Sequence, residues 1–343
     1  MNLEELAATA QALVAEGKGI LAADESGPTI ERRLKTVGLP STADSRRAWR
    51  ELLFTTEGIG KYISGVILFD ETIRQQGSDG TRLVETLQRQ GVIPGIKVDT
   101  GAEPLAGSPE ERVTEGLDGL RERLHEYREL GARFTKWRAV ITIGAGIPTP
   151  SCIAANAQAL GRCAALSQEA GLVPIVEPEV LMDGDHDIQR CFEVTEAALQ
   201  RVYAELFTQG VVLEGSLLKP NMVLSGKDAA NRAAPAAVAE ATIRCFRRTV
   251  PAAVPGVVFL SGGQSDEEAT LNLDAINKQG DGAPWQLSFS YGRGLQATPL
   301  KVWGGKPENV AEAQRALQHR ARVTSAARQG VYSPEMEKEA AGV

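Results

Sequence analysis

The segment Val211-Val-Leu-Glu-Gly-Ser-Leu-Leu-Lys-Pro-Asn-Met222 is an apolar run that ends in a lysine followed by a proline. Proline cannot continue a central strand, so this pattern predicts a strand over 211–218 with Lys219 at its carboxyl end. A lysine attacks a carbonyl carbon only as the neutral amine, a form that burial or a neighbouring cation favours. Lys219 is therefore a candidate Schiff-base nucleophile. The alternative is a lysine at the rim of the fold, with its stem packed and its ammonium in water.

The same arrangement, an apolar run followed by polar or charged residues, occurs eight times along the chain. It predicts seven further strands, at 19–23, 62–69, 93–98, 133–140, 172–176, 257–260 and 286–290. Amphipathic helical patterns lie between most of them, at 81–90, 111–130, 152–170, 187–209, 233–249 and 267–279. Additional helices are expected at 2–16, 29–37, 45–56 and 308–329.

This alternation of strands and helices favours successive βα units joined by right-handed crossovers. Eight units predict a single α/β domain over residues 1–343, a closed (β/α)8 TIM barrel with extra N-terminal and C-terminal helices and a short mobile tail at 332–343. A doubly wound open sheet is the alternative, but no GxGxxG motif follows the first strand.

Composition restricts the partners that the protein can have. The chain has 343 residues, 43% of them hydrophobic, and a net charge of −7, which disfavours nucleic acid or an anionic membrane as a partner. We expect a cytoplasmic protein, because the first residues lack the pattern of a signal peptide and no stretch approaches about twenty apolar residues. The four cysteines are widely spaced, which indicates free thiols in a reducing compartment.

In a barrel of this kind the chemistry takes place at the carboxyl ends of the strands, so residues far apart in sequence share one site. This places cations and carboxylates around one mouth: Asp24, Lys97, Lys136, Arg138, Glu177, Glu179, Lys219, Ser261 and Arg293. Each has a simpler interpretation by itself. Asp24 could cap the following helix, the two glutamates could be solvated loop acids, and Lys97 could form a rim ion pair with Asp99.

Two groups of residues could bind anions. Ser261, Gly262 and Gly263 expose backbone amides after the seventh strand and Arg293 follows the eighth, which is the frequent phosphate site of such barrels. A second anion site could be formed by Lys97 with Ser26, Thr29 and Arg33. Two cationic ends with a lysine between them suit a sugar that is phosphorylated at both ends.

Several motifs together resemble the class I, Schiff-base fructose-bisphosphate aldolases over nearly the whole chain. They are Gly19-Ile-Leu-Ala-Ala-Asp-Glu-Ser26, Gly95-Ile-Lys-Val-Asp99, Phe134-Thr-Lys-Trp-Arg138, Val176-Glu-Pro-Glu179, Leu217-Leu-Lys-Pro-Asn-Met222, Leu260-Ser-Gly-Gly-Gln264 and Ser290-Tyr-Gly-Arg293. The resemblance implies reversible cleavage of fructose 1,6-bisphosphate into two triose phosphates without a metal ion or other cofactor. It also suggests a homotetramer.

The resemblance also implies a role for each matching residue. Lys219 would form the imine, and Glu177, with Glu179 beside it, would be the acid and base of imine formation. Asp24 would accept the C4 hydroxyl proton, with Lys136 orienting it. Phosphate would bind at Ser261, Gly262, Gly263, Ser290 and Arg293. The remaining positions that match substrate contacts are Lys97, Arg138, Ser26, Thr29, Arg33 and Arg46, where Thr29 replaces the family's usual serine.

One departure from the family concerns the tail. Many members end in a tyrosine that assists proton transfer at C3, whereas this sequence ends Ala-Ala-Gly-Val and its last tyrosine is Tyr332. This puts in question the preference for bisphosphate over fructose 1-phosphate.

Two other functions are compatible with a barrel. One is a metal-dependent aldolase or phosphosugar isomerase, which the small number of histidines, three, disfavours. The other is a catalytically silent barrel that binds sugar phosphates or protein partners. It is disfavoured because Lys219, Glu177 and Asp24 are all present.

Overall fold

Eight parallel strands close a barrel in the computed structural model, which describes residues 2–338. The hydrogen-bonded order around the barrel is β1-β10-β9-β8-β7-β6-β3-β2. The barrel strands are β1 (Gly19–Ala23), β2 (Ile63–Leu68), β3 (Ile93–Lys97), β6 (Phe134–Ile141), β7 (Val173–Val180), β8 (Leu217–Leu218), β9 (Gly256–Phe259) and β10 (Gln286–Tyr291). The predicted (β/α)8 barrel is therefore confirmed.

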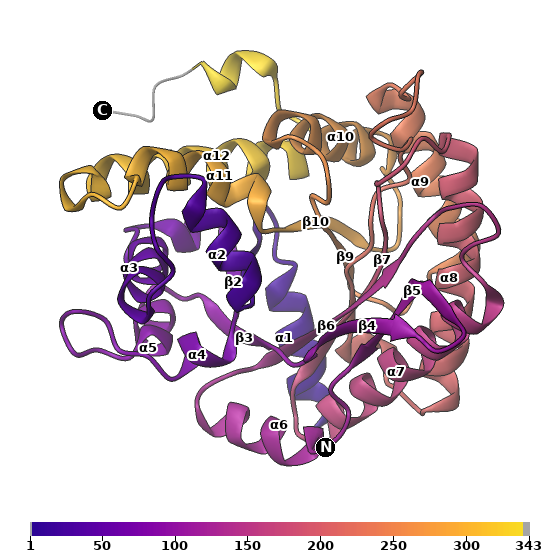
Figure 1. Cartoon of the computed structure of the whole chain (residues 1–343), viewed down its shortest axis with the longest axis horizontal. Coiled ribbons are helices and arrows are strands. Elements are labelled where there is room, and N and C mark those ends of the chain that lie inside the picture. The colour runs from indigo at the N-terminus through magenta and orange to yellow at the C-terminus, as the bar shows by residue number, and fades with distance from the viewer. Residues whose placement is uncertain (1, 339–343) are drawn as a thin grey trace.

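Helices surround the barrel on its outer side, as Figure 1 shows. They are α2 (Gly27–Lys35), α3 (Ala43–Phe54), α4 (Asp70–Ile73), α5 (Leu83–Arg89), α6 (Leu120–Glu129), α7 (Pro150–Glu169), α8 (Ile188–Thr208), α9 (Pro235–Thr249), α10 (Asp266–Gln279), α11 (Arg293–Trp303) and α12 (Val310–Arg328). Short 3-10 turns lie at Ile59–Lys61, Leu213–Gly215, Pro307–Asn309 and Pro334–Glu337. Within the described residues, no helix is both long enough and apolar enough to cross a membrane.

An additional helix at the start of the chain, α1 (Leu3–Leu13), covers the amino-terminal end of the barrel. Its buried residues Leu6, Ala10 and Leu13 form one apolar cluster with side chains inside the barrel, such as Phe134. The approach is close: a Cβ on Gly65, near the start of β2, would lie 2.7 Å from the Leu13 side chain. The barrel is thus filled and closed at this end.

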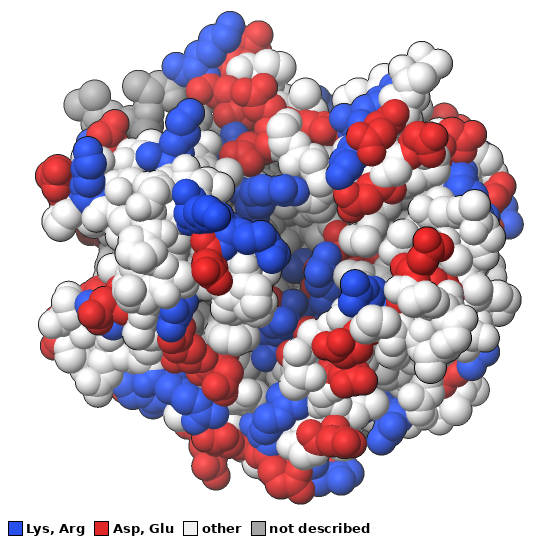
Figure 2. Space-filling model, in the orientation of Figure 1, with Lys and Arg blue, Asp and Glu red and all other residues white. Residues whose placement is uncertain are grey.

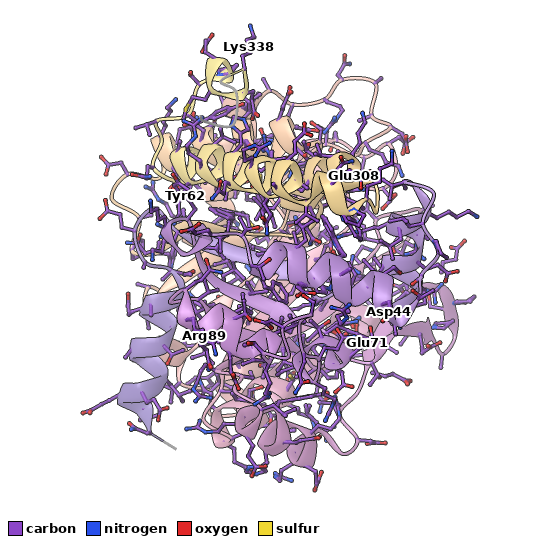
Figure 3. All side chains as sticks on the ribbon, turned by 90° about the vertical axis from the view of Figure 1, so that its left-hand side faces the viewer. Asp44, Tyr62, Glu71, Arg89, Glu308 and Lys338 are labelled. Carbon is purple, nitrogen blue, oxygen red and sulfur yellow. The ribbon has the colours of Figure 1, made fainter. Side chains whose placement is uncertain are left out.

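The opposite, carboxyl-terminal end is open. Figure 3 views the barrel from the side, with Tyr62, which precedes β2, toward the left and Glu71, which follows β2, toward the right. Figure 3 is turned by 90° so that the left-hand side of Figure 1 faces the viewer, and the front of Figure 1 therefore lies on the right in Figure 3. The carboxyl ends of the strands, on the side of Glu71, thus face the viewer in Figures 1 and 2.

The helix predicted over 111–130 is wrong in its first part. Residues Gly101–Leu105 (β4) and Ser108–Glu115 (β5) form an antiparallel hairpin, and α6 begins only at Leu120. The acidic side chain of Glu111, only 1% exposed, accepts hydrogen bonds from the backbone amide and the hydroxyl of Thr149, both at 2.7 Å. This distant partner holds the segment as a strand.

The strand predicted over 211–218 is also too long. A 3-10 turn occupies Leu213–Gly215, and only Leu217–Leu218 pair as β8. The amide of Val212 donates to Oε1 of Gln168, and Nε2 of Gln168 donates to the Val212 carbonyl, at 2.9 and 2.7 Å. A side chain therefore satisfies the backbone groups that a neighbouring strand would otherwise bind.

The expected mobile tail at 332–343 is described only as far as Lys338, and 339–343 lie outside the described residues. Its first part contacts the barrel's outer helices. Tyr332 is 5% exposed, its amide donates to Asp274, and its hydroxyl donates to Glu337 at 3.0 Å. Glu337 in turn accepts two hydrogen bonds from Arg320 of α12.

Candidate active site

The open end of the barrel contains a pocket of about 1040 Å³. All predicted site residues line it except Gly263 and Arg46, and they come from the ends of β1, β3, β6, β7, β8, β9 and β10 and from α2 and α11. Eight cationic and five carboxylate side chains line this pocket, so it is positive within a chain of net charge −7. Figure 2 shows lysine and arginine side chains gathered around the central hollow.

Lys219 lies at the base of the site. Its side chain is 4% exposed, and its Nζ lies 3.3 Å from Oε1 of Glu177. The position of the amine is fixed by the backbone, because the Lys219 amide donates to the Val176 carbonyl of β7 at 2.8 Å. Pro220 ends the strand directly afterwards, as the sequence indicated. The interpretation of Lys219 as a solvated rim lysine is therefore wrong.

Glu177 and Glu179 both line the pocket because side chains two residues apart in a strand point to the same face. They are 3% and 6% exposed, so the interpretation as solvated loop acids is wrong. The second oxygen of Glu177, Oε2, has no hydrogen-bond partner within residues 2–338 and lies 3.5 Å from Nζ of Lys136. One carboxylate thus lies between two lysines.

Lys136, on β6, is surrounded by acids. Its Nζ lies 2.7 Å from Oδ2 of Asp24 and 3.9 Å from Oδ2 of Asp99, in addition to Glu177. Burial by itself would lower the pKa of Lys136, but Asp24, Glu177 and Asp99 outweigh it and raise the pKa above its usual value. Lys136 is therefore an ammonium at neutral pH.

Asp24 does not cap a helix. The N-cap of α2 is Ser26, and the Asp24 carboxylate instead pairs with Lys136. Burial alone would raise the pKa of Asp24, but Lys136, Lys219 and Lys97 outweigh it and hold the pKa well below its usual value. Asp24 is consequently an ionised acceptor at neutral pH.

Two more ion pairs complete the wall on the β3–β6–β7 side. Nζ of Lys97 lies 3.2 Å from Oδ1 of Asp99, whose side chain is only 3% exposed. This pair is buried in the mouth and is not on its rim. Nε of Arg138 donates to Oε2 of Glu179 at 2.5 Å.

The loop after β9 and the start of α11 form one end of the pocket. Gly262 has a φ of +54°, a conformation that favours glycine, and its carbonyl accepts a hydrogen bond from Arg293. α11 begins at Arg293, so its first amides have no acceptor within the helix. The Ser290 hydroxyl beside them is buried and has no hydrogen-bond partner within residues 2–338. This end fits an anion.

α2 contributes a second group of hydroxyls and cations to the mouth, with Arg33 next to Gly292. The hydroxyls of Ser26 and Thr29 lie 3.5 Å apart, and Arg33 pairs with Glu25. Burial and the nearby Arg50 lower the pKa of Arg33 to about 10, so it remains cationic at neutral pH.

Two predicted residues do not line the mouth. Gly263 lies one residue beyond it, where a Cβ would meet the Met182 sulfur at 3.2 Å. Arg46 donates to both carboxylate oxygens of Glu71 at 2.8 and 2.6 Å and lines a separate pocket of about 240 Å³.

Sequence reasoning missed three charged residues of the mouth, which are Glu25, Arg32 and Arg112. Glu25 accepts hydrogen bonds from Arg33 and Gln296. In the sequence, only its position next to Asp24 pointed to the site. Arg112 lies on β5, in the segment interpreted as a helix, so its place at the mouth could not be inferred.

Comparisons with known proteins identify the family of this chain. The family model "Fructose-bisphosphate aldolase class-I" matches residues 5–343. The chain belongs to the class I fructose-bisphosphate aldolases.

Similar proteins from several organisms agree with this assignment. A "Probable fructose-bisphosphate aldolase class 1" of Xanthomonas campestris pv. campestris is 56% identical over 97% of this chain and 99% of its own length. The cytosolic fructose-bisphosphate aldolase 6 of Arabidopsis thaliana is 54% identical over 96% of this chain and 92% of its own. A crystal structure of Plasmodium falciparum aldolase, in complex with TRAP and an inhibitor, superposes with a TM-score of 0.95, at 51% identity, over 96% of this chain and 95% of that one.

The aldolase family sets the reaction. It is a metal-independent lyase reaction, the reversible cleavage of fructose 1,6-bisphosphate, and a Schiff base is typical of the family. A buried lysine beside a carboxylate, in a pocket where cations outnumber carboxylates, fits that chemistry in this aldolase.

Proposed function

We propose that Lys219 is the nucleophile of this aldolase and forms an imine with C2 of the ketose. The supporting observation is the position of its amine, which is withdrawn from solvent at the base of the cationic pocket and lies 3.3 Å from Glu177. The protonated imine accepts the electron pair when the C3–C4 bond breaks and becomes an enamine, so the nitrogen of Lys219 serves as the electron sink.

Glu177 is the acid and base of imine formation. The amine adds to the carbonyl, and the resulting carbinolamine must lose its hydroxyl as water, which requires a proton donor within hydrogen-bond reach. Glu177 is the carboxylate nearest to Lys219, and its second oxygen has no hydrogen-bond partner within residues 2–338. Glu179 is fixed to Arg138, so it positions that side chain.

Asp24 accepts the C4 hydroxyl proton as the C3–C4 bond breaks. An ionised carboxylate is the correct form for this role, and Lys136, 2.7 Å away, keeps it ionised. The Lys136 ammonium also stabilises negative charge that develops on the C4 oxygen before the proton has moved.

The two ends of the pocket hold the two phosphates. Ser261, Gly262, Ser290 and Arg293, with the neighbouring Gly263, offer amides, hydroxyls and a guanidinium at one end. Lys97, Ser26 and Thr29 offer a cation and hydroxyls for the other phosphate, together with Arg33, which also approaches Gly292, and Arg138 lines the same pocket. A preference for ketoses phosphorylated at both ends follows from the two separate anion sites.

We also propose a cytosolic homo-oligomer, a tetramer. Support comes from the cytosolic plant relatives and from the resemblance to the family. Size-exclusion chromatography with light scattering tests the assembly, and a mass of one subunit, about 37 kDa, contradicts it.

Borohydride trapping tests the assignment of Lys219. The protein is incubated with dihydroxyacetone phosphate, reduced, digested and mapped by mass spectrometry. We expect a single adduct on Lys219 that Lys219→Ala lacks. A wild-type adduct on another lysine, or full cleavage activity in Lys219→Ala, rejects the assignment.

A further inference from the structure

The β4–β5 hairpin brings a cation to the mouth of the barrel. In this hairpin Arg112 of β5 pairs with Pro104 and Thr114 pairs with Ala102. Residues that alternate along a strand share a face, so Arg112 lies on the same face as Thr114, whose hydroxyl donates to the Arg138 carbonyl of β6 at 2.8 Å. Arg112 is exposed and lines the same pocket as Lys219.

The backbone at this position is firmly held. The side-chain amide of Asn156 donates to the Arg112 carbonyl at 2.8 Å, and the neighbouring Glu111 carboxylate binds Thr149 from the opposite face of the strand. The Arg112 side chain therefore starts from a fixed point beside β6.

Arg112 differs from the other cations of the pocket in having no partner. Lys97, Lys136, Arg138, Lys219 and Arg33 each pair with a carboxylate, while Arg32 donates to Thr29 and Arg293 donates to Gly262. Within residues 2–338, the Arg112 guanidinium has neither a hydrogen bond nor an ion pair. Like Arg32 and Arg293, it has no carboxylate partner in that range, and unlike them it has no neutral acceptor either, so its guanidinium is available to an incoming anion.

We propose that Arg112 is a specificity-determining residue that favours ketoses carrying two phosphates over those carrying one, by attracting the incoming substrate. This inference rests on the proposed function of the pocket. A phosphate monoester carries about −1.5 to −2 charges at neutral pH, so a bisphosphate carries roughly twice the charge of a monophosphate. The attraction to one fixed cation scales with that charge, and it raises the association rate and therefore kcat/KM.

Arg112→Ala tests this proposal against a charge-matched control. Arg247→Ala removes an exposed arginine of α9, outside the pocket, and changes the net charge equally. At an ionic strength of about 10 mM, we expect Arg112→Ala to lower kcat/KM about fivefold for fructose 1,6-bisphosphate and about twofold for fructose 1-phosphate. Arg112→Lys should retain most of the wild-type value, and kcat should not change.

The dependence on salt gives a second measure. At about 150 mM ionic strength the Debye length falls from about 30 to about 8 Å, so the difference between wild type and Arg112→Ala should shrink. The proposal is overturned if Arg112→Ala has the same kcat/KM values as Arg247→Ala. It is also overturned if kcat/KM falls by the same factor for fructose 1,6-bisphosphate and fructose 1-phosphate. Failure of the proposed function would appear elsewhere, as the absence of a Lys219 adduct in the wild-type protein.

Discussion

Oδ2 of Asp24 lies 2.7 Å from Nζ of Lys136, although Asp24 follows β1 and Lys136 belongs to β6, on another side of the barrel. Each residue fixes the ionisation of the other: the ammonium lowers the pKa of the acid, and the acid helps to raise the pKa of the lysine. The pair joins an anionic acceptor and a cation at the point where the carbon–carbon bond would break.

Asp24→Asn should separate imine formation from cleavage. The amide cannot accept the C4 proton, so we expect kcat for fructose 1,6-bisphosphate to fall about 10²- to 10⁴-fold, the usual contribution of a general base. Trapping of the Lys219 adduct with dihydroxyacetone phosphate should persist. Asp281→Asn, at an exposed site outside the pocket, serves as the control, and cleavage by Asp24→Asn at the control's rate would refute the role.

Asp24→Asn should also change how the free energy of unfolding depends on pH in the acidic range. The pKa of Asp24 is lower in the folded protein than its ordinary value of 3.8, so the ionised carboxylate stabilises the fold above that value. This stabilisation is lost as the pH falls from about 5 through the unfolded-state value toward the folded-state one. Urea unfolding from about pH 6 to pH 3 should therefore show a shallower decline for Asp24→Asn than for wild type. If the free energies of unfolding of both proteins declined in parallel, the lowered pKa of Asp24 would be contradicted.

Arg293→Ala should weaken phosphate binding. Loss of a charge-assisted hydrogen bond typically costs about 1.5 to 3 kcal/mol, so KM for fructose 1,6-bisphosphate should rise roughly 10- to 100-fold. The KM of Arg293→Lys should lie between those of wild type and Arg293→Ala, because lysine retains the positive charge but not the planar guanidinium group. An unchanged KM in Arg293→Ala would remove this residue from the phosphate site.

Arg46→Ala should leave substrate binding almost intact. The resemblance to the family suggested a substrate contact, but the Arg46 guanidinium is bound to Glu71 outside the mouth. We expect KM within about twofold of wild type and a stability loss of at most about 1 kcal/mol, as for a partly exposed ion pair. A rise in KM comparable to that of Arg293→Ala would restore Arg46 to the substrate site.

Leu13→Ala should destabilise the barrel without changing its chemistry. Leu13 is fully buried where α1 packs into the barrel, and a leucine-to-alanine change in a core typically costs about 2 to 5 kcal/mol. Chemical denaturation measures the loss, with KM unchanged in the folded enzyme. Leu3→Ala, at a 47% exposed position of the same helix, should cost less than about 0.5 kcal/mol.

The barrel could be predicted because its strands are short apolar runs that end in charged or turn residues, a local signal. The placement of Asp24, Lys136, Glu177 and Lys219 followed from one rule, that the carboxyl ends of parallel strands meet. These four side chains do lie together in the structure.

What could not be predicted depends on distant partners. The hairpin containing Arg112 requires the contact between Glu111 and Thr149, and the interruption of 211–218 requires Gln168. Arg46 lies outside the mouth because it binds Glu71, which is 25 positions away in sequence. The helix at Arg293–Trp303 was not predicted from the sequence.

The helix that closes the amino-terminal end has a consequence for proton traffic. With α1 filling that end, Lys219 faces bulk water through the mouth, the passage that a bisphosphate would occupy under the proposed function. Under that proposal, protons would move among groups inside the pocket while substrate is bound, and Glu177, which lies between two lysines, would carry them. Substrate entry and proton exchange with water would thus share one opening of the barrel, and a bound substrate would block it.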